Sequence, residues 1–305
     1  MKTKINSYIN LIDQSLGLQN PEQLLHLFLR LMLILLLLFM NDNAYLSIFM
    51  PVFLVPGILF KSIAHNKYYW LLLSVISALF YLVLDLVGYV PNHKHMFAYA
   101  IIAVTAVLFM NEKAQVLSSL GLQSRFIIGL CFLFATAGKF LAPEFLDGRF
   151  FDFTNTTDPR FFGVTSIVGD IDKQQLILNE SNLRNLINSG NPNGFFTLNI
   201  NDKVSFLGMI LSYWTIFIEG MIAISFCLPE RFKLSKYRNW FLVAFILTTY
   251  PIATVAGFAI ILTALGFMQS IEDNKVTNYS RFYLLVFLVL PLIDIPFSRI
   301  FKIFL

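Results

Sequence analysis

The sequence predicts an all-α protein that crosses a membrane about eight times, with one long outer loop between the fifth and sixth helices. Composition is the first reason: 57% of the 305 residues are hydrophobic and only 13% are charged, whereas soluble chains are about 25% charged. The second reason is that the apolar residues gather in runs of roughly 20 residues, the length that spans a bilayer. Membrane topology explains the modest net charge of +4, so we expect no nucleic-acid partner.

Five apolar runs follow a polar start of the chain. Residues 1–23 predict a cytoplasmic segment, and because no cleavage site follows them we expect the first helix to be retained. Residues 24–142 then hold the first five predicted helices, at about 24–40, 45–60, 69–90, 95–110 and 125–142. The second and the fourth are short for a complete crossing.

A polar segment separates these helices from the last three. Residues 143–203 contain Gly, Pro and Asn punctuation and one predicted helix near 172–188. Because about 60 residues are too many for a plain connection, we expect this segment to cover the helix bundle. Residues 204–305 hold predicted helices at about 204–228, 239–268 and 282–303. Pro251 predicts a kink or a break in the seventh.

Lysine and arginine in the short loops orient the predicted helices. With the N-terminus in the cytoplasm, only Lys94, Lys275 and Arg281 fall in short outer loops, and the cytoplasmic side holds a clear excess of both residue types. This asymmetry predicts that both termini are cytoplasmic and that 143–203 lies outside. A multi-pass protein of this kind fits a bacterial plasma membrane, with lipid as its surroundings.

One lysine lies inside the fifth predicted helix. Lys139 follows a run of small residues at 135–138, and small residues mark close helix contacts in membranes. We therefore expect the amine to point into the bundle, where a buried lysine can serve as a base. The alternative is a side chain that extends to the outer headgroups and anchors the helix.

Other polar residues are expected at the same level. Asp85 lies near the outer end of the third predicted helix, and Asn92, His93 and His95 belong to the turn before the fourth. We expect Asp85, His93, His95 and Lys139 to share a pocket that opens outward. Asp85 and Lys139 could instead form an ion pair that only neutralises two buried charges. The two histidines resemble a weak metal pair, but no third ligand is evident, so we expect no metal.

The sixth and seventh predicted helices contribute further polar groups. Glu219 lies at about mid-depth on the face that also carries Ser212 and Thr215. An ionisable group at that depth faces the bundle interior or a cavity, because contact with lipid is costly. Tyr250 precedes Pro251 and belongs to a polar stretch in the seventh helix.

Two of these motifs occur together at a characteristic spacing. Asn92-His93 lies at the predicted outer turn, and about 45 residues later Ala-Gly-Lys at 137–139 precedes Leu-Ala-Pro-Glu-Phe-Leu-Asp-Gly at 141–148. This pattern, with an acidic residue in the sixth helix, resembles the horizontally transferred transmembrane family. That family includes the membrane part of vitamin K-dependent gamma-glutamyl carboxylase. The short chain is similar to bacterial members of the sporulation-delaying-protein B type, which assist maturation of a secreted peptide toxin.

The resemblance implies a quinol-linked site at the outer face. In the carboxylase a lysine deprotonates vitamin K hydroquinone, oxygen converts the quinol to an epoxide, and a peptidyl glutamate is carboxylated. Carried over, Lys139 would be the base for vitamin K hydroquinone or menaquinol, with His93 as its partner. Asn92 would position the turn. The other supporting residues, Asp85, His95, Glu219 and Tyr250, are candidates from their predicted places in the helices. The substrate would be a secreted peptide or protein.

A second, non-enzymatic interpretation remains open. The chain could be a maturation, export or immunity factor for a secreted membrane-active peptide. In that interpretation the 143–203 segment is the binding surface.

Overall fold

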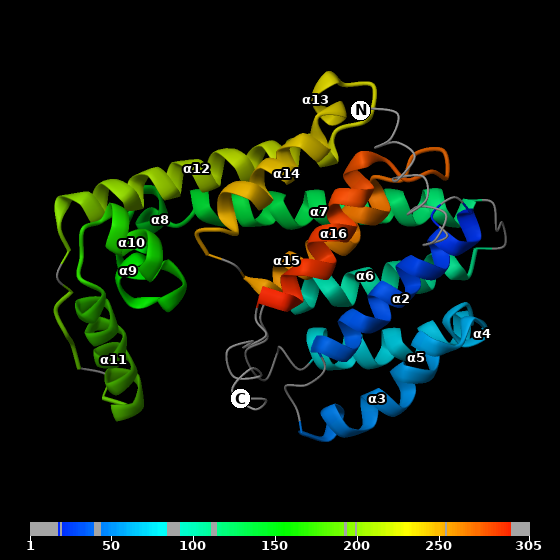
Figure 1. The fold of residues 1–305 in the computed structure, drawn as a ribbon, viewed down its shortest axis with the longest axis horizontal. Coiled ribbons are helices and arrows are strands. Elements are labelled where there is room, and N and C mark those ends of the chain that lie inside the picture. Colours follow the sequence, from blue (N-terminus) through cyan, green and yellow to red (C-terminus); the bar gives the residue numbers. More distant parts are fainter. Residues whose placement is uncertain are drawn as a thin grey trace, which may run out of the picture. The chain divides into compact units, whose positions relative to one another are not determined.

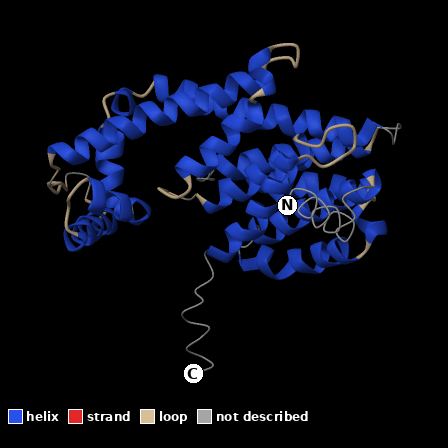
Figure 2. Cartoon of the chain, turned by 45° about the horizontal axis from the view of Figure 1, so that its top comes forward, coloured by secondary structure: helices blue, strands red, loops and turns tan. Residues whose placement is uncertain are grey.

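A computed structural model describes residues 18, 20–39, 44–83, 92–110, 115–191, 194–198, 200–253 and 255–293. Figure 2 shows that helices, in blue, make up nearly all of this part of the chain, so the predicted all-α class is confirmed. The described residues divide into two compact units. One comprises Met1–Ile128 with Ala256–Leu305, and the other comprises Gly129–Val255.

The first unit holds the N-terminal and C-terminal helices (Figure 1). Its elements are α2 (Pro21–Phe39), α3 (Ala44–Leu59), α4 (Lys61–Ala64), α5 (Lys67–Ala78), the π-helical turn η1 (Leu79–Val83), α6 (Asn92–Leu108), the first half of α7 (Val116–Phe140), α15 (Ala256–Gln269) and α16 (Asn278–Ile293). Helices α15 and α16 pack closely because Gly266 leaves room for the buried ring of Tyr283.

The second unit holds the candidate functional residues. After the end of α7 it continues through α8 (Pro143–Leu146), α9 (Arg149–Thr157), the 3-10 turn η4 (Pro159–Phe161), α10 (Phe162–Val168), α11 (Lys173–Ser189), α12 (Asp202–Cys227), α13 (Lys233–Lys236) and α14 (Arg238–Thr249). We refer to residues 143–189 as the α8–α11 segment. In Figure 1 α9 and α10 lie beside the first half of α12.

Three helices of the described part are long and apolar enough to cross a membrane. They are Pro21–Leu38, Val116–Phe140 and Asp202–Cys227, and four shorter helices are also apolar. On α12 the exposed apolar side chains from Phe206 to Ile224 recur on one stripe, which is about 27 Å long and close to the thickness of a bilayer core. The predicted count of eight crossings remains a prediction.

Small residues hold α7 against α12. A methyl group at Gly129 would come within 2.8 Å of Cys227 Sγ, so the two backbones approach closely there. Farther along the two helices, a methyl group added at Gly220 would lie 3.7 Å from Thr136 Cγ2. The two contacts show that α7 and α12 run antiparallel. Close approach through glycine and other small residues is the usual means of helix association inside membranes.

One predicted boundary is wrong, and the break that Pro251 predicted is confirmed. The fifth helix was expected to begin near 125, but α7 begins at Val116 and Arg125 lies inside it with 6% of its surface exposed. The run 239–268 is not one helix, because α14 ends at Thr249 and α15 begins at Ala256. Pro251 falls in this break, where it cannot supply the backbone N–H of a continuing helix.

The α8–α11 segment contains more helix than the sequence predicted. The expected helix near 172–188 is confirmed as α11, which Asp172 caps by accepting a hydrogen bond from the Gln174 N–H. Helices α8, α9 and α10 were not predicted. They are 4, 9 and 7 residues long, which is too short for a clear helical period. Gly148, at φ +85°, permits the sharp turn before α9.

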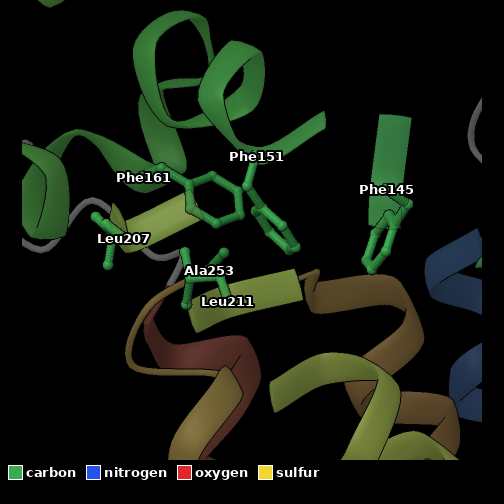
Figure 3. Packing of buried hydrophobic residues seen from close by; sticks show 6 residues of the cluster. All are labelled: Phe145, Phe151, Phe161, Leu207, Leu211 and Ala253. Carbon is green, nitrogen blue, oxygen red and sulfur yellow. The ribbon is translucent and has the colours of Figure 1, made fainter. Parts of the chain in front are cut away.

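An apolar cluster fixes this segment on α12. Figure 3 shows Phe151 and Phe161 next to Leu207 and Ala253. The cluster consists of Phe145, Phe151, Phe161, Leu207, Leu211 and Ala253, each exposed by less than a tenth. The start of α12 is therefore covered by short helices of the α8–α11 segment.

Candidate functional site

Lys139 forms an ion pair with Glu219 across the α7–α12 interface. The Nζ atom lies 2.6 Å from Glu219 Oε2, and the two side chains are only 19% and 10% exposed. The same Nζ lies 5.3 Å from the centre of the Phe145 ring, which adds a cation–π contact. The lysine thus contacts the neighbouring helix, 80 residues away in sequence.

The helices bring these two residues together because small side chains surround them. Gly220 follows Glu219, and a methyl group at position 220 would lie 3.7 Å from Thr136 Cγ2. Thr136 precedes Lys139 by three positions and so lies on the same face of α7. With both backbones close, a lysine and a glutamate reach each other directly. Each charge is otherwise costly in an apolar bundle, so pairing is a condition for burying them.

Two hydroxyl groups lie on the same helix faces as the ion pair. Thr136 Oγ1 and Ser212 Oγ are buried, and within the described structure neither makes a hydrogen bond. Thr215, by contrast, donates to the Leu211 carbonyl at 2.6 Å. Since buried hydroxyls normally have partners, the two orphaned groups are suited to a polar ligand or a water molecule.

Tyr250 lies in the same unit as the ion pair, directly after the last residue of α14. Its ring packs on Phe245 at 5.8 Å, and Phe245 packs on Phe132 of α7 at 5.1 Å. This chain of aromatic rings joins the end of α14 to the helix that carries Lys139.

The other predicted site residues belong to the first unit. His93 and His95 are half-buried on the first turn of α6, which begins at Asn92, so the expected turn at this position is wrong. Asp85 and the side chain of Asn92 lie outside the described residues. The expected pocket of Asp85, His93, His95 and Lys139 therefore remains a prediction. Among the residues that the structure describes, no three His, Cys, Asp or Glu side chains gather as metal ligands would.

A groove in the α8–α11 segment was missed by the sequence reasoning. It is an open groove of about 480 Å³ between α9, η4 and α11. Its lining comprises Phe153, Thr154, Thr157, Asp158, Pro159, Arg160, Glu180, Leu183, Arg184 and Ile187. Two arginine–carboxylate pairs stand in this lining, and the short spacings Asp-x-Arg and Glu-x-x-x-Arg were the signals that could have indicated them.

The first of these pairs is held by several hydrogen bonds. Arg160 Nε donates to both carboxylate oxygens of Asp158 at 3.0 Å, and the Arg160 backbone N–H donates to Oδ1 at 3.0 Å. Burial alone would raise the pKa of Asp158, but these hydrogen bonds outweigh it and hold that pKa below its usual value. The same bonds raise the pKa of Arg160. Both groups are therefore charged at neutral pH.

No family model, no curated protein and no solved structure matches this chain. The geometry of the ion pair and of the groove is therefore the basis for proposing a function.

Proposed function

We propose that this chain is a membrane-embedded enzyme in which the Lys139–Glu219 pair takes a proton from a reduced quinone. The observation that carries the proposal is the 2.6 Å contact between two nearly buried, oppositely charged groups on two helices long enough to cross a membrane. Ionisable groups inside membrane helices commonly mark functional sites. The resemblance of residues 137–148 to the carboxylase motif gives the substrate class.

The residues around the pair suit a reduced quinone. The ring of Phe145 offers an apolar surface beside the ammonium group. The orphaned hydroxyls of Thr136 and Ser212 can bond to the oxygens of such a ligand. An aromatic ring with two polar oxygens matches this mixture of apolar and polar groups.

The pair acts as one unit because its two charges are in direct contact. Glu219 accepts a proton from a hydroxyl of the quinol, and Lys139 stabilises the negative charge that remains on the oxygen. One O–H bond breaks on the quinol and one forms on the carboxylate. The pair changes from neutral to singly positive while the quinol becomes singly negative, so charge is conserved. Over a full turnover the quinol and one molecule of oxygen give the epoxide and one molecule of water, so molecular oxygen is the oxidant, as in the carboxylase.

Quinol turnover tests this proposal. Purified wild type, Lys139→Met and Glu219→Gln would receive a reduced naphthoquinone and oxygen, and mass spectrometry would follow the epoxide. Lys203→Met is the control, because Lys203 forms a comparable pair with Asp170 at 2.7 Å on the surface. We expect epoxide from wild type and control and a loss of about 100-fold in the other two. Folded wild type that forms no epoxide from several quinols would refute the proposal.

A second candidate function is the binding of a secreted peptide without chemistry, in maturation, export or immunity. The groove between α9 and α11 favours it, because apolar side chains and two arginines line the same open surface. The two functions are compatible, since an enzyme that acts on a peptide also has to bind it.

A further inference from the structure

The lining of the groove includes apolar side chains and two arginines. Phe153, Leu183 and Ile187 supply the apolar surface, and the exposed fractions of Phe153 and Ile187 are 44% and 68%. Large apolar side chains at such exposure leave area that a ligand can cover. Arg160 and Arg184 flank this surface from η4 and α11.

The two arginines present donors toward the solvent while their carboxylate partners are shielded. The side chains of Arg160 and Arg184 are 48% and 72% exposed, against 22% for Asp158 and 21% for Glu180. Each pairing uses Nε and Nη2 of the guanidinium group. The Nη1 group of each arginine makes none of these contacts and can donate to an incoming ligand.

The carboxylates also fix the arginines in place before a ligand arrives. An arginine held by two hydrogen bonds loses little side-chain freedom when it binds a further acceptor. Asp158 additionally caps its turn, accepting from the Arg160 N–H, and Glu180 lies one helical turn before Arg184. The donors are thus positioned by the local structure.

We propose that this groove binds a carboxylate-bearing segment of a peptide. An acidic side chain or a C-terminal carboxylate would accept hydrogen bonds from Nη1 of Arg160 and Arg184, and neighbouring apolar residues would cover Phe153, Leu183 and Ile187. The inference deepens the proposed function by naming the binding chemistry, and it rests on that function for the choice of a peptide. Formal charge in the lining sums to zero, which favours one directed carboxylate over a broadly anionic membrane surface.

Peptide binding is measured without quinol, so that absence of peptide binding in the groove is distinguishable from absence of quinol oxidation. The full chain in detergent would be titrated with the labelled peptide dansyl-Leu-Glu-Leu-Glu-Leu-amide and with the same peptide carrying Gln for Glu. Wild type should bind the Glu peptide at least about tenfold more tightly, because charge-assisted hydrogen bonds are worth roughly twice neutral ones.

Substitutions then locate the site. Arg160→Gln and Arg184→Gln should each weaken binding of the Glu peptide about tenfold and leave the Gln peptide nearly unchanged. Arg149→Gln is the matched control, because Arg149 forms the same Asp-x-Arg pair with Asp147 at 2.7 Å but lies outside the groove lining. Arg160→Gln alone leaves the Asp158 carboxylate without its partner, and this charge could itself repel the Glu peptide. The double variant Asp158→Asn with Arg160→Gln removes both charges, so any remaining loss of affinity comes from the missing arginine.

Three results would overturn the proposal. Equal affinity of wild type for the two peptides would show that no carboxylate is recognised. A loss in Arg149→Gln as large as that in Arg160→Gln would place the effect outside the groove. Competition by phosphatidylglycerol vesicles that displaces both peptides alike would identify the surface as a lipid contact.

Discussion

Replacement of Lys139 by methionine should destabilise the folded protein because it leaves Glu219 buried without a partner. Methionine is unbranched like lysine and only one atom shorter, so the substitution removes the charge and little volume. Breaking a buried ion pair from one side typically costs about 3–5 kcal/mol. Since the Lys139 side chain is 19% exposed, water can partly solvate the remaining carboxylate, and we expect about 3 kcal/mol, the lower end of that range.

A second variant shows whether the loss of stability comes from the unpaired Glu219 carboxylate or from lost packing. Glu219→Leu in the Lys139→Met background removes the unpaired carboxylate and should restore most of the loss, since apolar replacements of buried pairs are often nearly neutral. With about 2–4 °C per kcal/mol for a chain of this order of size, the single variant should unfold about 6–12 °C lower. The double variant should return to within about 4 °C of wild type.

The assay is thermal unfolding in detergent, followed by circular dichroism. Lys203→Met serves as control, because its pair with Asp170 has side chains 62% and 72% exposed and should contribute less than about 1 kcal/mol. A Lys139→Met protein that unfolds with the control would refute the reasoning. So would a double variant that is no more stable than the single one.

Three further predictions concern packing and charge, and thermal unfolding checks each of them. Gly129→Ala should lower the unfolding temperature by bringing a methyl group within 2.8 Å of Cys227 Sγ, whereas Gly138→Ala, with nothing within 4 Å, should raise it through helix propensity; equal effects would contradict the α7–α12 contact. Phe145→Ala should cost about 3 kcal/mol because Phe145 is 6% exposed, and Phe195→Ala, at 90% exposure, should have no measurable effect. Burial raises the pKa of Asp152 above its usual 3.8, so the folded state favours the neutral form: stability should increase as pH falls from above that raised pKa toward 3.8, and Asp152→Asn should remove this part of the pH dependence.

The sequence predicted those elements whose signals are local. Helix α11 has an aspartate cap and a terminal glycine in the chain itself, and α12 is a continuous apolar run. Arg125 misled the prediction because a charged residue resembles the end of a membrane helix, whereas the structure buries it inside α7. The break after Thr249 was foreseen as one of two outcomes of Pro251.

The candidate site was predictable residue by residue but not as an arrangement. Lys139 and Glu219 were each conspicuous as ionisable groups in apolar runs. Their contact depends on which helices are neighbours, and no spacing in the sequence encodes a pairing over 80 residues. Arg160 and Arg184 were not among the predicted site residues, because a groove arises only when α9 and α11 pack together.

The close approach of Gly129 to Cys227 makes the Cys227 thiol a reporter of helix packing. The thiol is partly exposed, so a reagent can reach it, and a group attached to Sγ has to fit beside Gly129, where even an added methyl group would lie 2.8 Å from the sulfur. The rate of alkylation therefore depends on how closely α7 and α12 pack at this level. A ligand that binds only to the packed arrangement should slow this modification as its occupancy rises.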